Sequence, residues 1–380
     1  MKPLQVLARL DWWLVLLAAT LSGLGLLYLR SATQTEFEGR HLRQAGFLAL
    51  GVGTGAILIL LPYARVLRGA WPIYGAVLLA LVLLPWFGAD PRNGARRWYS
   101  VGGFSLQPAE FAKLALILVL ASWLRFRAKA ATFEGLVVPV LLALVPGVLI
   151  LRQPNLSSFL VLWPILLAMC WAAGTPGRTL LGLVAVGLAV LVAGYFFFLH
   201  GYQSERIDTW LAHFTWADWD QREARAAFLD AGLQPMNSLI AIGSGGWTGA
   251  GLGQGPQNVY GFLPYRSEDY IFAVVCEETG LLGALTVLGL LAGIVFACLR
   301  AAFLVRERFG RLVCVGVAAW LATQGLVHAY VCAWLLPSTG QPLPLVSYGG
   351  SAILVVCLGL ALVLNIGARR EPVLGGEAFL

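Results

Sequence analysis

The sequence predicts an all-α, polytopic membrane protein with about ten transmembrane helices, organised as one domain over residues 1–380. The chain is 59% hydrophobic and only 12% charged, whereas a soluble domain carries roughly 25% charged residues. Uncharged runs such as Trp12–Leu29 are long enough to cross a hydrocarbon core about 30 Å thick, which takes about 20 helical residues. The runs lack the alternation of apolar and polar residues that a membrane β-barrel requires, so the spans are expected to be helices.

Ten apolar segments account for the expected helices, and a long segment from residue 200 to 268 precedes the eighth. The first segment is expected to be a span and not a cleaved signal peptide, because it is long and no small-residue cleavage site clearly ends it. In chain order, the ten segments are Trp12–Leu29, Gln44–Leu61, Trp71–Phe87, Glu110–Arg125, Gly135–Leu151, Ser158–Ala173, Leu180–Leu199, Asp269–Leu299, Leu312–Leu336 and Leu345–Gly367.

Lysine and arginine set the expected orientation, because the short cytoplasmic loops of membrane proteins are enriched in them. With the N-terminus inside, the inner segments carry fourteen of these residues and the short outer segments carry seven. Both termini are therefore expected in the cytoplasm, and segment 200–268 is expected outside. The same topology explains the net charge of +7 without any interaction with nucleic acid.

The long external segment begins as an amphipathic, acidic stretch whose tryptophans, such as Trp210, suit a helix lying in the membrane interface. It then becomes rich in glycine, in the run G-S-G-G-W-T-G-A-G-L-G-Q-G over residues 243–255. The run lacks the Gly-Lys-Ser/Thr ending of a P-loop. Two interpretations stay open: close packing against the membrane surface, or contact between a pyrophosphate and the backbone amides of Ser244, Gly245 and Gly246.

Charged residues at or inside expected spans are costly in a membrane and usually functional. Asp269 opens the eighth segment and is followed at once by aromatic and aliphatic residues, so it is the first candidate for catalysis. Its neighbour Glu268 is equally well interpreted as a helix-capping carboxylate. Glu110 and Lys113 are three residues apart and share one helix face, where they form either a neutralised pair in the bundle or a pair that faces the substrate.

Three further features lie near the expected membrane surfaces or within the spans. Arg96 and Arg97 precede a tryptophan and either anchor to anionic headgroups or contact a substrate phosphate. His328 has no partner at ligand spacing and is expected to be a packed polar residue. The last segment starts among helix breakers in residues 342–351, and broken helices are tolerated where they line a cavity, which makes Ser347 a candidate for substrate contact.

Four motifs follow one another along nearly the whole chain. The first combines A-R-R-W with Q-P-A-E-F-A-K-L, and the second is S-L-I-A-I-G-S-G-G-W-T-G-A-G-L-G-Q-G. The third is L-P-Y-R-S-E-D-Y-I-F-A-V-V-C-E-E-T-G-L-L-G, and the fourth is L-L-P-S-T-G-Q-P-L-P-L-V-S-Y-G-G-S-A. On about ten spans, these motifs resemble the SEDS family of bacterial cell-wall polymerases (RodA, FtsW, SpoVE), and the ending S-Y-G-G-S-A looks closer to RodA than to FtsW.

The resemblance implies a peptidoglycan glycosyltransferase that polymerises lipid II on the outer face of the bacterial cytoplasmic membrane, in cell elongation or division. It also implies two kinds of partner, a class B penicillin-binding protein and other membrane proteins of the elongation or division complex. The essential acidic residue of the family falls on Asp269, and its Glu and Lys fall on Glu110 and Lys113. The departing undecaprenyl pyrophosphate needs positive charge, which Arg96, Arg97, Lys113, the glycine-rich run or a divalent cation (Mg²⁺ or Mn²⁺) can supply.

The chain departs from the family pattern at Asn155, Ala250 and His328, where Asp, Lys and Asn are common. Loss of the aspartate is expected to weaken a polar or cation site near the cavity. Two other functions stay open: a flippase for lipid-linked oligosaccharides, and a non-catalytic scaffold of the cell-wall synthesis complex. A transporter needs charges near the midplane and access from both sides, whereas the candidate residues of this chain cluster toward the outside.

Overall fold

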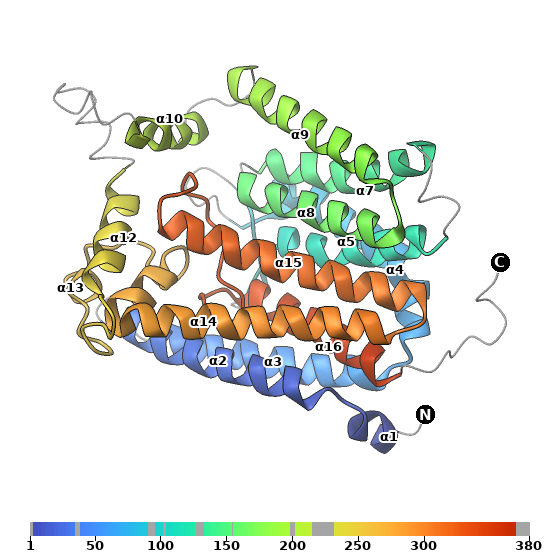
Figure 1. Cartoon of the computed structure of the whole chain (residues 1–380), viewed down its shortest axis with the longest axis horizontal. Helices are drawn as coiled ribbons and strands as arrows, with labels where there is room; N and C mark the ends of the chain where they lie inside the picture. Colours follow the sequence, from blue (N-terminus) through green and yellow to red (C-terminus); the bar gives the residue numbers. More distant parts are fainter. Residues whose placement is uncertain are drawn as a thin grey trace.

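The structure is a computed structural model that describes residues 3–34, 39–89, 96–101, 104–126, 133–153, 155–197, 202–214 and 232–369. In this part of the chain, ten helices are 17 residues or longer, and each overlies one of the ten expected segments (Figure 1). They are α2 (Trp12–Ala32), α3 (Arg40–Leu60), α4 (Tyr63–Phe87), α5 (Pro108–Leu124), α7 (Phe133–Leu151), α8 (Leu156–Ala173), α9 (Gly177–Phe197), α14 (Ile271–Leu304), α15 (Arg308–Cys332) and α16 (Gly350–Ala368).

Seven of these helices are long and apolar enough to cross a membrane, namely α2, α3, α4, α8, α14, α15 and α16. The chain is therefore a polytopic helical membrane protein, as predicted, while a count of ten crossings stays a prediction. The short helix α1 (Pro3–Ala8) and the end of α16 lie at one end of the bundle (Figure 1). Two other short helices, α12 (Leu233–Ser244) and α13 (Pro256–Val259), lie at the opposite end. This arrangement agrees with an even number of crossings.

The centre of the bundle is α5, which contacts α4, α7, α8, α15 and α16. Fourteen of its 17 residues are buried, as is expected of a largely apolar helix surrounded by others. The outer helix α3 packs closely along α16, where small residues let the backbones approach one another. A side-chain carbon at Gly51 of α3 would lie 2.9 Å from the sulfur of Cys357, so a larger residue there would force the Cys357 side chain to shift.

A hydrogen bond between α4 and α7 compensates for a proline in the second helix. Pro146 has no N–H, so the carbonyl of Leu142 loses its usual partner within α7. The hydroxyl of Tyr74 in α4 donates to this carbonyl at 2.8 Å. An unsatisfied carbonyl is costly inside a membrane, and this bond therefore both stabilises the proline-containing helix and attaches it to α4.

Two elements lie outside the helical bundle: a hairpin that the sequence does not predict, and a helix in the stretch around Trp210, where the sequence predicts one. A two-stranded antiparallel hairpin, β1 (Tyr99–Val101) and β2 (Phe104–Leu106), precedes α5. The helix α10 (Tyr202–Phe214) forms the described beginning of the long segment before α14. The hairpin places Arg97 next to the bundle, and α10 carries Arg206, so both elements bring cations toward the site described below.

Two of the expected spans are interrupted, and the interruptions build the site. The expected helix Asp269–Leu299 is wrong as one continuous element, because α14 starts at Ile271 and is broken at Gly280, whose φ of 63° and ψ of −159° are not helical. The expected start of the last helix at Leu345 is also wrong, because α16 begins only at Gly350. Its proline-containing approach folds back into the bundle, where the carbonyl of Leu345 would lie 2.6 Å from a side-chain carbon at Gly25 of α2.

Candidate active site

Asp269 lies immediately before α14, in the turn that leads into the helix. Its backbone N–H donates to the carbonyl of Tyr265 at 3.0 Å, and the thiol of Cys332 in α15 donates to its carbonyl at 3.7 Å. The carboxylate faces the approach to α16, since a side-chain carbon at Gly340 would lie 3.4 Å from its Oδ2 atom. Three elements therefore fix the position of this acid.

The environment makes Asp269 a stronger base than an ordinary aspartate. Burial raises its pKa to about 7, and the charge of Glu268 contributes to the rise. The positive charges of Arg206 and Arg97 act in the opposite direction. A carboxylate with a pKa near neutrality accepts a proton at physiological pH far better than an unperturbed one, which is the requirement for a general base.

Glu268 is an ion-pairing residue, and its interpretation as a helix cap is wrong. The N-cap of α14 is Tyr270, and no side chain caps the helix there. The Glu268 carboxylate instead accepts a 2.8 Å bond from Arg40 Nη1 at the start of α3. The same nitrogen donates to the hydroxyl of Ser267 at 3.0 Å, and the guanidinium lies 5.0 Å from the centre of the Tyr348 ring. Arg40 therefore holds Glu268 in a fixed position beside Asp269.

The structure separates the two neighbouring arginines that the sequence treats alike. Arg97 Nε donates to the carbonyl of Gln153 at 2.9 Å, and its charge reaches Asp269. Arg96 is exposed and donates to the carbonyl of Pro85, at the end of α4. Of the pair, only Arg97 therefore belongs to the surroundings of Asp269.

Arg206 is a second cation near Asp269, and the sequence interpretation missed it. It lies on α10, and its Nη1 donates to the carbonyl of Ser338 at 2.8 Å. Ser338 is two residues from Gly340, which faces Asp269, so the arginine joins the site through the loop before α16. The amphipathic pattern around Arg206 could have marked it as part of a helix, but no sequence motif connects it to Asp269.

The segment 338–349, which we name the approach loop, connects the surroundings of Asp269 to the interior of the bundle. Ser347 Oγ donates to the carbonyl of Glu268 at 2.7 Å and accepts the N–H of Leu343 at 2.8 Å. The carbonyl of Ser347 accepts from Gln44 Nε2 of α3 at 2.9 Å. Ser347 therefore fixes the backbone at Glu268, next to Asp269 in the sequence, and its expected contact with substrate stays a prediction.

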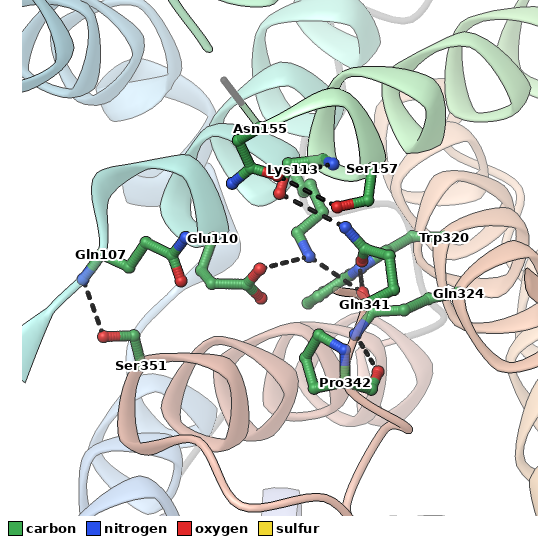
Figure 2. A network of polar contacts seen from close by, with 11 residues as sticks. Gln107, Glu110, Lys113, Asn155, Ser157, Trp320, Gln324, Gln341, Pro342 and Ser351 are labelled. Atoms are coloured by element: carbon green, nitrogen blue, oxygen red, sulfur yellow. Dashed lines mark hydrogen bonds and ion pairs between the residues drawn. The ribbon is translucent and has the colours of Figure 1, made fainter. Parts of the chain in front are cut away.

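Glu110 and Lys113 form a buried ion pair on α5, as one of the two sequence interpretations expects. Lys113 Nζ lies 2.8 Å from Glu110 Oε1 and 2.9 Å from Gln324 Oε1 of α15 (Figure 2). Its amine also lies 5.5 Å from the centre of the Trp320 ring. Both side chains are almost fully buried, and Glu110 Oε2 has no partner among the described residues. The pair is neutralised within the bundle, but this unpaired oxygen leaves one acceptor available.

The approach loop also connects this ion pair with the outer part of the site. Gln324 Nε2 donates to the carbonyl of Pro342 at 2.7 Å, and Gln107 N donates to Ser351 Oγ at 2.9 Å (Figure 2). His328 Nδ1 lies 2.6 Å from the carbonyl of Gln341, so this buried histidine is a packed polar residue, as predicted. The approach loop thus faces the Asp269 carboxylate at Gly340, contacts the ion pair indirectly through Pro342 and Gln324, and bonds the carbonyl of Glu268 through Ser347.

Asn155, which stands where the family usually has aspartate, caps helix α8. Its Oδ1 accepts the N–H of Ser158 at 3.1 Å and the hydroxyl of Ser157 at 3.1 Å (Figure 2). An asparagine performs this capping role about as well as an aspartate. The substitution therefore preserves the helix start while it removes one negative charge from the buried cluster around Lys113.

The glycine-rich run lies against the break in α14 and not beside Asp269. A side-chain carbon at Gly245 would lie 1.9 Å from the carbonyl oxygen of Cys276, and one at Gly280 would lie 2.5 Å from the carbonyl carbon of Trp247. The N–H of Leu281 donates to the carbonyl of Gly246 at 2.9 Å, and Ser244 Oγ bonds within its own helix. These contacts support the close-packing interpretation, and a pyrophosphate contact of Ser244, Gly245 or Gly246 stays a prediction.

The described residues contain no group of three or more His, Cys, Asp or Glu side chains that could hold a metal ion. A divalent cation at Asp269 would therefore take most of its ligands from substrate phosphate oxygens and water, as Mg²⁺ commonly does. The expected divalent cation remains a proposal.

The features above define a helical membrane protein with an acidic centre at one end of its bundle. The family model for FtsW, RodA and SpoVE, described as "Cell cycle protein", matches residues 9–371. The chain therefore belongs to this family, known as the SEDS family.

Two sequence relatives share most of their length with this chain. The "Probable peptidoglycan glycosyltransferase FtsW" of Nitrosococcus halophilus is 34% identical over 94% of this chain and 92% of its own length. The protein of the same description from Thioalkalivibrio sulfidiphilus is 36% identical over 97% of this chain and 91% of its own length. Both relatives are described as FtsW and not as RodA. The expected closeness of this chain to RodA therefore stays a prediction.

Two solved structures share the fold. A chain from the structure described as "Structural coordination of polymerization and crosslinking by a peptidoglycan synthase complex" has a TM-score of 0.79 and 31% identity, and the match covers 96% of this chain and 99% of that chain. The rod shape determining protein RodA of Thermus thermophilus has a TM-score of 0.69 and 30% identity, with 95% and 98% covered.

Proposed function

We propose that this protein is a peptidoglycan glycosyltransferase that polymerises lipid II into glycan strands. The observation that carries this proposal is the position of Asp269, a carboxylate with a pKa of about 7 within reach of the charges of two arginines, at one end of a membrane bundle. Such a site combines a proton acceptor with positive charge for an anionic leaving group. The family membership and the description of the FtsW relatives as peptidoglycan glycosyltransferases support the same conclusion.

The reaction needs one displacement at the anomeric carbon of a lipid-linked sugar. A hydroxyl of the acceptor sugar forms a new C–O bond to this carbon, while the bond to the undecaprenyl pyrophosphate breaks with its electron pair. The hydroxyl proton passes to the Asp269 carboxylate. A single displacement inverts the configuration, so one general base is sufficient and no second carboxylate is needed as a nucleophile.

The pyrophosphate develops negative charge as it leaves, and preorganised cations stabilise it. Arg97 and Arg206 are the cations whose charges reach Asp269. Guanidinium groups suit this task because they bind phosphate oxygens in a bidentate manner. Lys113 is fully buried and paired with Glu110, so we assign it to the positioning of the approach loop through Gln324 and not to the leaving group.

The two alternative functions fit the geometry less well. A flippase would move a charged headgroup through the bundle. The charged pair inside the bundle is already neutralised, and Gln324, which binds it, is tied to the approach loop. A non-catalytic scaffold would not need an aspartate held by contacts from three elements.

We further propose that the chain resides in the bacterial cytoplasmic membrane with both termini in the cytoplasm and the α12–α13 end outside. A class B penicillin-binding protein is the proposed partner, and the similarity to a chain of a peptidoglycan synthase complex supports such an assembly. Other membrane proteins of the elongation or division complex are further proposed partners. Lipid II is exposed for polymerisation on the outer face, at the end where Asp269 and α10 lie.

The direct test uses the purified chain in liposomes with fluorescently labelled lipid II, with and without a class B penicillin-binding protein. The proposal predicts glycan strands that lysozyme digests, and more of them when the partner is present. Absence of glycan under both conditions, with lipid II binding intact, would favour the scaffold. Transfer of labelled lipid II between leaflets without polymerisation would favour the flippase.

A further inference from the structure

The second half of the long external segment carries no charge. The 33 residues from Gly232 to Pro264 include no Asp, Glu, Lys, Arg or His. An aqueous segment of this length would carry several charges at the usual proportion of about one residue in four. The composition of residues 232–264 is therefore that of a membrane-contacting segment, although it lies between spans.

Helix α12 presents an apolar stripe away from the bundle. Leu233, Met236 and Ile240 follow one another at helical spacing of three and four residues, and all are exposed. The opposite face is attached to the bundle, where Ser238 Oγ donates to the carbonyl of Cys332 at the end of α15 at 2.7 Å. The helix runs across the end of α14 and not along it (Figure 1). A helix in this orientation, with one apolar face uncovered, is typical of helices that lie in a membrane interface.

Large aromatic side chains continue this stripe. Trp247 and Tyr260 are 73% and 72% exposed, and Phe262 is 54% exposed. Asn237 of α12 bonds the carbonyl of Phe262, so these aromatics and the helix form one structural unit. Tryptophan and tyrosine are enriched at membrane–water interfaces, where their rings reach the headgroup level.

The surface is continuous with the outer face of a helix that crosses the membrane. The carbonyl of Trp247 accepts the N–H of Leu282 in α14 at 3.2 Å. Leu282 and Leu285 are exposed on α14 and belong to an apolar stretch that is long enough to span. Trp247 therefore continues the apolar surface that α14 exposes.

The backbone of this segment is prepared for low polarity. The N–H groups of Ala250 and Gly251 donate to the carbonyls of Glu277 and Glu278, both at 2.9 Å. The carboxylate of Glu277 accepts the N–H groups of Gln257 and Asn258 at 2.7 and 3.2 Å. Non-helical backbone at membrane depth is tolerated only where its polar groups are satisfied in this way.

From these observations we propose that residues 233–262 form a monotopic insertion into the leaflet at the α12 end of the bundle. Its contact surface, the interfacial patch, consists of Leu233, Met236, Ile240, Trp247, Tyr260 and Phe262. The partner of the patch is the lipid surface itself, with apolar side chains about 5–10 Å below the headgroups. The segment then leads within a few residues to Asp269, so it holds the beginning of α14 at the level of the lipid headgroups. This inference does not depend on the proposed enzymatic activity.

Spin labels in liposomes test the insertion with the full chain and no other protein. Trp247→Cys and Phe262→Cys report on the patch, and Met236→Cys tests the same surface should either variant fail to fold. Leu285→Cys on the exposed face of α14 is the lipid reference, and Arg178→Cys, exposed in the first turn of α9, is the water reference. The wild-type chain, whose cysteines are buried or partly buried, gives the background of labelling.

The measurement is the ratio of collisions with oxygen, which concentrates in lipid, to collisions with a nickel chelate, which stays in water on both sides. The proposal predicts ratios above one at the patch positions, close to the ratio of the Leu285 label. The Arg178 label, which is in water, is expected to give a ratio below one. Ratios that match the Arg178 label would overturn it. Labels that are wet in liposomes and become shielded only when a class B penicillin-binding protein is added would show a protein-docking surface instead, and would also overturn it.

Discussion

Arg40 Nη1 lies 2.8 Å from Glu268 Oε1, so the carboxylate next to Asp269 in the sequence is paired with a cation from another helix. Without this partner, the charge of Glu268 would act more strongly on Asp269. The ion pair is partly exposed, and its contribution to the stability of the fold is therefore expected to be small. The ion pair matters because it limits the effect of the Glu268 charge on the pKa of Asp269.

The first prediction is a pH dependence. Asp269 must be ionised to accept a proton, so lipid II polymerisation should rise as the pH increases through about 7 and fall below it. Arg40→Gln leaves Glu268 uncompensated, which raises the pKa of Asp269 further and shifts the rise in activity to higher pH. Initial rates of polymerisation between pH 5 and 9 measure this shift. Arg43→Gln, an exposed neighbour on α3, is the control and should leave the profile unchanged. A profile that Arg40→Gln leaves in place would contradict the proposed link.

A second prediction separates the two neighbouring arginines. Arg97→Gln should reduce the polymerisation rate by about tenfold to a hundredfold, since a hydrogen bond to a charged group is worth about 1.5–3 kcal/mol. It should also shift the activity profile to higher pH, because a positive charge near Asp269 is lost. Arg96→Gln should have little effect, because Arg96 bonds only the end of α4 among its described contacts. Equal losses for the two variants would show that the structure places the wrong arginine at the site.

The third prediction concerns the ion pair inside the bundle. Glu110→Gln or Lys113→Met alone should destabilise the protein by about 3–5 kcal/mol, because each leaves a buried charge without its partner. The double variant should lose less than the sum of the two single losses. Thermal unfolding in detergent, together with the rate of polymerisation, measures this non-additivity. If the losses are additive, the two residues act separately, and the pairing does not stabilise the bundle.

A fourth prediction tests the topology. Asp208 is exposed on α10, and a cysteine there should react with a membrane-impermeant maleimide in intact cells. A cysteine at Arg178, in the first turn of α9, should react only after lysis. The wild-type chain serves as the background control, since its cysteines are buried or partly buried. The reverse pattern of labelling would place the chemistry on the inner face.

Much of the fold follows from the sequence because uncharged runs of about 20 residues have few alternatives to a membrane helix. The Glu110–Lys113 pair could be predicted for a similar reason, as a spacing of three residues brings two side chains together on any helix. The break of α14 at Gly280 could not, because it depends on the glycine-rich run that packs into it. A local pattern cannot reveal such a contact.

The part of the site that the sequence could not predict depends on contacts between distant segments. Arg40 and Glu268 are 228 residues apart, and nothing in either segment selects the other. Arg206 lies on a short helix whose position depends on the carbonyl of Ser338. Asp269 can be recognised from the sequence because a charge at the start of an apolar run is rare, whereas an arginine in an external segment is common.

The most direct test of the central claim is the rate of lipid II polymerisation by Asp269→Asn in liposomes. Asparagine keeps the shape of the side chain and removes the proton acceptor, so the rate should fall by about 10²–10⁴-fold, with lipid II binding and thermal unfolding unchanged. Glu268→Gln, which alters the neighbouring carboxylate that pairs with Arg40, should lose far less. Polymerisation by Asp269→Asn at close to the wild-type rate would contradict the assignment of Asp269 as the general base.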